Sequence, residues 1–156
     1  METIPILSVE DVQQLDAILN DFLQKSEANL AVVIDKGGTV ISQQGDFNIA
    51  DTTILAALAA GSFAATKELA RRIGEIEFSA LYHQGKDAHI FMTSIDENNI
   101  LITIFGEQTT VGLVRFYTVN ATSQLAQLLA KLRARSKEAG FQFDAEDIEE
   151  VGKIFT

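Results

Sequence analysis

The stretch Asp51–Glu75, DTTILAALAAGSFAATKELARRIGE, decides the fold of this chain. At ordinary helical pitch it predicts one long helix of about six or seven turns. Asp51, Thr52 or Thr53 can cap its start, because their side-chain oxygens accept hydrogen bonds from the free amides of the first turn, and Gly74 stands where a helix often ends. Large apolar residues recur at helical spacing, which predicts that their stripe faces a core. These residues are Leu55, Leu58, Leu69 and Ile73, with Ala65 between them.

The middle turns of this helix carry almost no polar side chain. Phe63 projects there among small residues, namely Ala56, Ala57, Ala59, Ala60, Gly61, Ser62, Ala64 and Ala65. One interpretation is an alanine-rich helix buried by its own domain. The other is a second buried face, on which small residues let another backbone come close. The simplest such partner is the same helix of a second copy.

Composition limits the class of protein. The length of 156 residues suits one domain with a sizeable core, and 47% hydrophobic residues indicate a globular fold. The formal net charge of −10 argues against binding to nucleic acid or to anionic membrane surfaces, because no excess of Lys and Arg is available to neutralise phosphates. The absence of cysteine excludes disulfides, thiolate metal sites and cysteine nucleophiles.

Neither the N-terminus nor the apolar runs indicate a membrane or secreted protein. METIPILSVEDV is acidic where a secretory signal is basic. The longest weakly polar run, Ile54–Ala65, is too short to span a bilayer. We therefore expect a cytoplasmic protein without membrane insertion.

The remaining segments predict a mixed α/β order. Ser8–Lys25 is typical of an amphipathic helix with Ser8 as N-cap and Asp11 in a capping box. Thr109–Thr118 could extend a strand or begin the following helix. Predicted strands are Leu30–Ile34, Thr39–Gln43, Phe78–His83, His89–Ile95 and Ile100–Phe105, and the last predicted long helix is Asn120–Ser136.

This order predicts an α/β (α+β sandwich) fold. A five-stranded antiparallel sheet would carry the central helix on one face and the two terminal helices on the other, so that the apolar strand Ile100–Phe105 is covered on both sides. Residues 1–136 would form this domain. Residues 137–156 would form a linker around Gly140 and a short acidic amphipathic segment, Asp144–Phe155, which could dock on its own domain or on a partner.

Three stretches resemble the Roadblock/LC7 family, and the similarity extends over roughly Val9 to Ser136. They are LAVVIDKGGTVIS at Leu30–Ser42, the central helix, and GLVRFY at Gly112–Tyr117. Within the family the chain is most similar to bacterial MglB-type proteins, which are partners of a Ras-like GTPase in cell polarity and motility. The acidic end, FDAEDIEEVGKIF, resembles the C-terminal segment of those proteins.

The resemblance implies a homodimeric regulator of a small Ras-like GTPase. Family members dimerise by pairing the third strand and packing the central helices side by side, and the GTPase sits on the resulting platform. MglB-type dimers are regarded as GTPase-activating proteins that reshape the GTPase without donating a catalytic residue. By position, the implied dimer interface is Ala57, Gly61, Ala64, Glu68, Phe78, Ala80 and Tyr82. The implied GTPase contacts are Ala60, Phe63 and Lys67, with Ile148, Val151 and Phe155 in the acidic segment.

Two alternatives remain open at this stage. The first is a dimeric scaffold or adaptor that leaves nucleotide turnover unchanged, as some Roadblock proteins are. The second is a small-molecule sensor with a pocket between sheet and helix. A sensor pocket needs convergent polar groups, of which Ile100–Phe105 offers only Thr103.

Nothing in the sequence predicts an enzyme, a metal site or a cofactor. The phosphate-binding motif G-x-x-x-x-G-K-[ST] is missing. His83 and His89 could approach across a hairpin, but no carboxylate is placed to complete a metal site and no residue pattern suggests a triad. Arg71 and Arg72 could act as arginine fingers, although basic residues at a helix end are more simply explained by the helix dipole.

Overall fold

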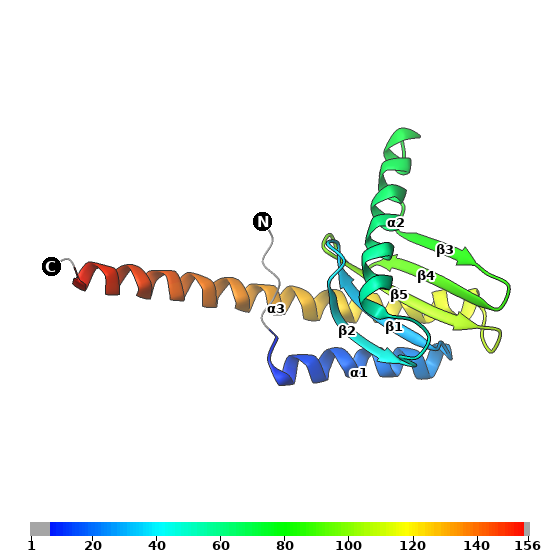
Figure 1. Ribbon diagram of the computed structural model, residues 1–156, viewed down its shortest axis with the longest axis horizontal. Coiled ribbons are helices and arrows are strands. Elements are labelled where there is room, and N and C mark those ends of the chain that lie inside the picture. Colours follow the sequence, from blue (N-terminus) through cyan, green and yellow to red (C-terminus); the bar gives the residue numbers. More distant parts are fainter. Residues whose placement is uncertain (1–6, 155–156) are drawn as a thin grey trace.

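The computed structural model describes the backbone of residues 7–154 and the side chains of residues 7–137. Its helices and strands follow the predicted order (Figure 1). They are α1 Val9–Ser26, β1 Leu30–Asp35, β2 Val40–Gly45, α2 Thr52–Arg72, β3 Ala80–Gln84, β4 Ala88–Ser94, β5 Asn99–Gly106 and α3 Val111–Ile154. None of the helices in this part of the chain has an apolar stretch long enough to cross a membrane.

The strands form one antiparallel sheet in the order β2-β1-β5-β4-β3. The central strand, β5, pairs with β1 on one side and with β4 on the other. Its residues are buried from Asn99 to Phe105, because helices cover both faces and leave no position for a solvated side chain. The prediction of a central, doubly covered strand is confirmed.

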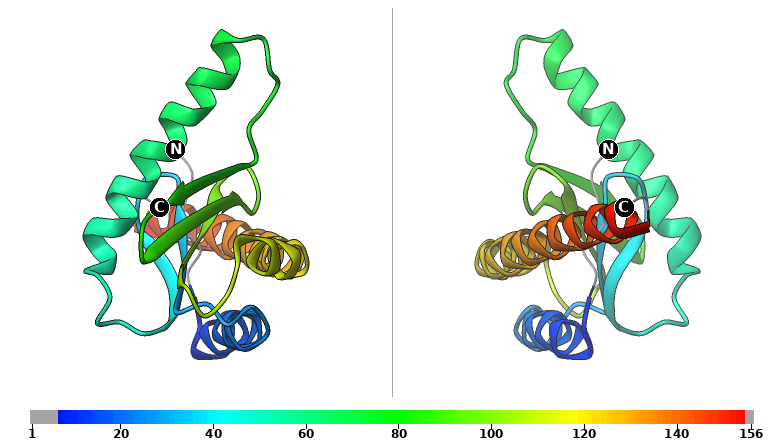
Figure 2. Two further views of the ribbon diagram at one scale, coloured as in Figure 1. Left: turned by 90° about the vertical axis from the view of Figure 1, so that its right-hand side faces the viewer. Right: turned by 90° about the vertical axis from the view of Figure 1, so that its left-hand side faces the viewer.

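Helices cover the two faces of the sheet as predicted. Figure 2 shows α2 on one side of the sheet and α1 with α3 on the other. Alternate residues of β5 point into two separate cores. Leu101 and Phe105 pack with α1 and α3, whereas Ile102 and Ile104 pack with α2. The structure therefore confirms the predicted α/β fold, with one helix on one face and two on the other.

The N-terminus of α1 is fixed by the capping box that the sequence predicts. The Asp11 backbone N–H donates to Ser8 Oγ at 3.1 Å, and the Ser8 backbone N–H donates to Asp11 Oδ2 at 2.9 Å. Arg135 of α3 donates to the same carboxylate oxygen and so ties the two helices together. The Arg135 side chain and the capping hydrogen bonds lower the pKa of Asp11 from 3.8 to about 2.

The third helix is longer than predicted at both ends. It begins at Val111, so the helical alternative for Thr109–Thr118 is the correct one. Its backbone then continues as a helix through Gly140 to Ile154, where the sequence suggested a linker. A glycine inside a helix costs only about 1 kcal/mol relative to alanine, which good helix formers on either side can offset.

The predicted contacts of the acidic segment remain predictions. The side chains of Ile148 and Val151, and Phe155 as a whole, lie outside the described residues. The division into residues 1–136 and 137–156 likewise stays a prediction, although the helical backbone crosses that boundary without interruption.

Candidate functional site on α2 and the edge strand

The side of α2 that faces the sheet is made of small residues and one phenylalanine. Its buried residues are Ala56, Ala59, Ala60, Phe63, Thr66 and Ala70. Alanines let the helix axis lie close to the large side chains of β1 and β5, such as Val32 and Ile102, and Phe63 fills the remaining space. Asp51 caps the helix by accepting from the backbone N–H of Thr53 at 3.0 Å.

The stripe predicted to face the core therefore points largely outward. Leu58 is 67% exposed, Leu69 62% and Ile73 73%, while Leu55 is only partly buried. The prediction failed because both stripes of the helix are apolar, so helical periodicity alone does not say which of them meets the sheet. Counting large side chains favoured the wrong stripe.

Two of the predicted GTPase contacts belong to the protein's own core. Ala60 is 8% exposed and Phe63 is 1% exposed, both against the sheet. The expectation that they project from the surface is wrong. The stripe of small residues was predicted to pack on a partner, but it packs on the protein's own sheet. Lys67 is half-buried one turn further along, with its ammonium 5.8 Å from the centre of the Phe63 ring.

The outer side of α2 carries the other predicted residues. Ala57, Gly61, Ala64 and Glu68 are all exposed. Apart from its two neighbours and the helix's own backbone, no atom of the described residues lies within 4 Å of the place where a Cβ on Gly61 would stand, so this side of the helix has open space above it. Beside these small residues lie large exposed ones, Ile54, Leu58, Leu69 and Ile73. This set of residues is called the outer face of α2 below.

Charged side chains end the outer face. Glu68 accepts hydrogen bonds from Arg71 at 2.9 Å and from Arg72 at 3.0 Å, one turn or less along the same helix. Both guanidiniums are thus paired at the C-terminal end of α2, where positive charge also favours the helix dipole. This is the arrangement expected of a solvated helix end.

The edge strand β3 lies next to the projecting end of α2. In the described part of the chain β3 pairs with β4 alone, so its other side has unpaired backbone groups. Ala80 is exposed, Tyr82 is partly buried against Phe105, and Phe78 lies just before the strand. In Figures 1 and 2 the last turns of α2 extend beyond the sheet, and the chain returns to β3 through an extended loop.

The two histidines do not come together. His89 pairs with Gln84 across the hairpin and His83 pairs with Ile90, so the two side chains point to opposite faces of the sheet. His89 Nδ1 accepts from the Gly85 backbone N–H at 3.2 Å, and its Nε2 lies 3.1 Å from Glu107. Among the residues whose side chains are described, no group of three or more His, Cys, Asp or Glu could hold a metal ion.

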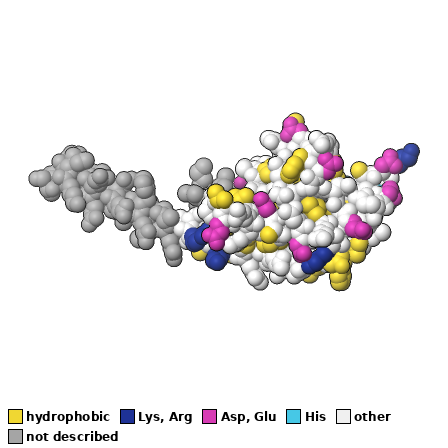
Figure 3. Space-filling view, turned by 90° about the horizontal axis from the view of Figure 1, so that it is seen from below, with side chains coloured by type: hydrophobic (Ala, Val, Ile, Leu, Met, Phe, Trp, Pro, Cys, Tyr) yellow, Lys and Arg dark blue, Asp and Glu magenta, His cyan; other side chains and the backbone are white. Residues whose placement is uncertain are grey.

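Acidic side chains outnumber basic ones on the surface. Figure 3 shows acidic side chains spread around one face of the domain, with few basic ones between them. This fits the net charge of −10, and a surface of this sign repels polyanions.

Comparison with known proteins agrees with the fold. The family model for the Roadblock/LC7 domain matches residues 14–105. The chain therefore belongs to the Roadblock/LC7 family.

Among solved structures the chain is similar to MglB proteins. MglB from Myxococcus xanthus is 32% identical, with a TM-score of 0.75 over 81% of this chain and 96% of that one. The gliding protein MglB from Thermus thermophilus is 26% identical, with a TM-score of 0.76 over 84% and 99% of the two chains. An MglB with a tetrameric arrangement is 25% identical, with a TM-score of 0.77 over 85% and 99%.

Proposed function

We propose that this protein is a homodimeric regulator of a small Ras-like GTPase, of the GTPase-activating type. The observation that carries the proposal is the outer face of α2, on which large and small apolar residues lie exposed together. A monomer gains nothing from such a surface, since each large apolar side chain left in water forgoes about 1.5–3 kcal/mol of burial. Similarity to MglB proteins at 25% to 32% identity supports the same class of function.

The second copy would cover the C-terminal half of the outer face. Leu69 and Ile73 lie at the C-terminal end of α2, whose last turns extend beyond the sheet at the edge formed by β3 (Figure 1). Antiparallel pairing of two β3 strands would satisfy their backbone groups and bring the two helices side by side. Ala64 and Glu68 lie in the same C-terminal half of α2, so the dimer contact predicted for them is retained in this proposal.

The GTPase would take the N-terminal half of the outer face. Ile54 and Leu58 supply large apolar contacts there. Ala57 and Gly61, which the family resemblance assigned to the dimer interface, are given to the GTPase in this proposal, because such small residues let a partner backbone come close. These residues replace Ala60 and Phe63, whose burial against the sheet leaves them no surface to offer. Replacing Phe63 would test the packing of the core and not the binding of a partner.

Activation would come from reshaping the GTPase. Arg71 and Arg72 are both bound to Glu68, which does not suit a guanidinium that must reach a transferring phosphate. The similar structure from Thermus thermophilus is called a gliding protein, which agrees with a role in motility. With the role in polarity that the family resemblance implies, we propose that the regulated GTPase acts in cell polarity and motility in the cytoplasm.

Pull-down followed by a turnover assay tests this proposal. The protein serves as bait in a lysate of its own organism, once with GDP and once with a non-hydrolysable GTP analogue. We expect a small GTPase retained with the analogue and lost with Leu58→Arg, and faster single-turnover hydrolysis when the purified bait is added. Phe116→Arg, at a 69% exposed site on α3 across the sheet, is the matched control and should behave as wild type.

The outcomes separate the two classes of function. Retention of a GTPase without any change in its hydrolysis rate would favour the dimeric scaffold or adaptor. Equal retention by the wild type and by Leu58→Arg would remove the outer face of α2 as the GTPase surface.

A further inference from the structure

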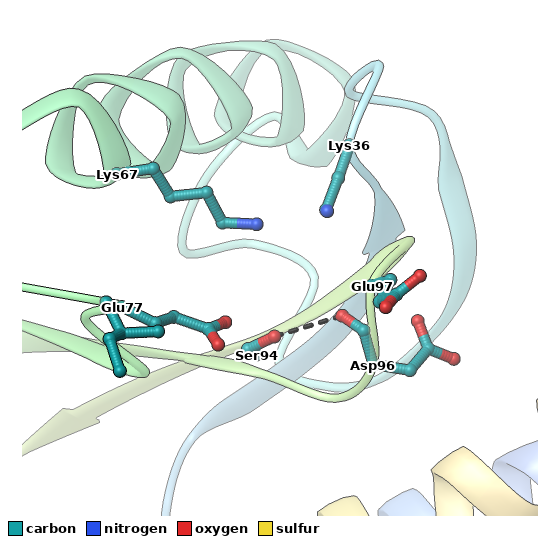
Figure 4. Close-up of a pocket in the computed structure, with 7 residues that line it drawn as sticks. Lys36, Lys67, Glu77, Ser94, Asp96 and Glu97 are labelled. Atoms are coloured by element: carbon teal, nitrogen blue, oxygen red, sulfur yellow. Dashed lines mark hydrogen bonds between the residues drawn. The ribbon is translucent and has the colours of Figure 1, made fainter. Parts of the chain in front are cut away.

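A polar cavity of about 460 Å³ lies under the second half of α2 (Figure 4). It is bounded by α2, by the loop between α2 and β3, and by the turns that connect β1 with β2 and β4 with β5. Its lining residues are Lys36, Lys67, Ile76, Glu77, Ser94, Asp96 and Glu97. The cavity is on the sheet side of the helix, apart from the outer face.

Two ammonium groups meet at the top of this cavity. Figure 4 shows the side chains of Lys36 and Lys67 directed toward one another from the β1–β2 turn and from α2. Among the residues whose side chains are described, no carboxylate lies within ion-pair distance of either lysine. The neighbouring Lys36 ammonium, together with partial burial, lowers the pKa of Lys67, and the charges of Glu77 and Glu97 oppose this effect. Two like charges so placed favour an anion between them.

Carboxylates line the opposite side. Figure 4 places Glu77 below Lys67 and Glu97 below Lys36. Asp96 differs from these two, because its carboxylate accepts from the backbone N–H of Asn98 at 2.7 Å, from the Asn99 amide at 3.1 Å and from Arg133. Glu77 and Glu97 are therefore the carboxylates left for a ligand, while Asp96 holds the β4–β5 turn in place.

We propose that this cavity binds a small zwitterion of the amino-acid or short-peptide class, with its carboxylate between Lys36 and Lys67 and its ammonium against Glu77 and Glu97. The volume lies within the range of about 300–1,000 Å³ that is usual for small-molecule sites. Separated positive and negative walls orient such a ligand, whereas a simple anion meets repulsion from the acidic wall. This binding does not depend on the proposed GTPase.

From the sequence, the sensor hypothesis had little support, because the central strand Ile100–Phe105 offers Thr103 as its only polar side chain. Thr103 in fact lies on the side of β5 that faces α1 and α3, opposite Ala31 and Phe91, so it takes no part in this cavity. The polar groups come from turns and from α2, which lie far apart in the sequence. Only the fold brings Lys36 and Lys67 together.

Nuclear magnetic resonance with ¹³C-labelled lysine tests the proposal on the full chain. The probes are glycylglycine, a zwitterion, and N-acetylglycylglycine, which keeps the carboxylate and lacks the ammonium. We expect saturable shifts of the Lys36 and Lys67 side-chain signals with both probes, and binding of glycylglycine tighter by about threefold or more, as one partly exposed ion pair would give.

Matched variants locate the two ends of the ligand. Lys36→Gln should abolish the saturable shift of Lys67, while Lys131→Gln, at an exposed site on α3 across the sheet, should leave it unchanged. Glu77→Gln should remove the preference for glycylglycine. Backbone amide spectra check that each variant is folded. If Lys36→Gln does not fold, Lys67→Gln takes its place, with the Lys36 signal as the readout.

Two results would overturn the inference. Shifts that rise linearly with either probe, or that persist in Lys36→Gln, would mean that the lysines are solvated side chains without a ligand site. Equal affinity for the two probes would show that Glu77 and Glu97 do not select a cationic group.

Discussion

Asp11 shows how one side chain can hold two helices in register. It completes the capping box with Ser8 at the start of α1 and accepts a hydrogen bond from Arg135 near the middle of α3. The residue is only 3% exposed. The two roles reinforce each other, because a carboxylate that accepts several donors is stabilised in its charged form. The pKa of Asp11 falls to about 2 for this reason. The capping role was visible in the local sequence, whereas the contact with Arg135 was not.

This lowered pKa predicts a specific pH dependence of stability. A carboxyl whose pKa is lower in the folded state contributes stability above its unfolded value, and that contribution is lost as pH falls through the folded value. For Asp11 the window runs from pH 3.8 down to about 2. We expect Asp11→Asn to be less stable than wild type at pH 7, with the difference shrinking across this window.

Urea unfolding followed by circular dichroism at several pH values measures the difference. Asp21→Asn is the matched control, since Asp21 lies on the same helix and only pairs with Lys25 in an exposed i,i+4 contact. Such contacts contribute little, so this variant should follow the wild-type curve. A gap between Asp11→Asn and wild type that stays constant between pH 7 and pH 2 would contradict the assignment.

At the scale of the element, α2 is a helix with two apolar sides of different character. Small residues on the inner side allow close packing on the sheet, and Gly38 in the β1–β2 turn lies so near that an added Cβ would be 3.0 Å from the Ala57 Cα. The outer side keeps its large apolar residues in solvent. The helix is thus held firmly by its own domain while the opposite side remains available.

Replacing Gly38, beside α2, and Gly61, within it, by alanine should change the free energy of unfolding in opposite directions. Gly38 has a φ of +89° and a crowded Cβ position, so Gly38→Ala should cost roughly 1–2 kcal/mol of stability. Gly61 is helical with nothing within 4 Å of its Cβ position, so Gly61→Ala should gain about 0.5–1 kcal/mol. Urea unfolding measures both values. A destabilised Gly61→Ala would mean that the outer face is not open in the isolated subunit.

The positions of helices and strands in the sequence were easier to predict than which side of each one is buried. Strong periodicity placed α1 and the strands, and the apolar run of β5 correctly indicated a strand covered on both faces. The inner side of α2 escaped prediction because alanines carry a weak periodic signal. The continuation of α3 through Gly140 escaped because a glycine permits a helix as well as a break.

The candidate site was predicted only in part, for the same physical reasons. Ala57, Gly61, Ala64 and Glu68 are on the surface as a helix seam requires. Ala60 and Phe63 are not, because they lie on the adjacent stripe that the sheet covers. Leu58 and Leu69 share the outer side with the small residues, at spacings that could have indicated an apolar outer stripe. Residues brought together by long-range contacts, such as Lys36 and Lys67, leave no local signal.

At the scale of the whole molecule, the unpaired side of β3 and the projecting end of α2 lie at the same edge of the domain. One twofold axis beside that edge would pair both features at once, extending the sheet and covering Leu69 and Ile73. The central claim of the proposed function is that a second copy binds here, since the GTPase platform depends on the paired helices.

Sedimentation equilibrium of the wild type, Leu69→Arg and the α3 control Phe116→Arg tests this claim most directly. We predict a dimer for the wild type and for Phe116→Arg at low micromolar concentration, and a monomer with an unchanged circular dichroism spectrum for Leu69→Arg. The arginine would place a charge in the seam without entering the core, because Leu69 is 62% exposed in the single chain. A monomeric wild type, or a dimer unaffected by Leu69→Arg, would contradict the account.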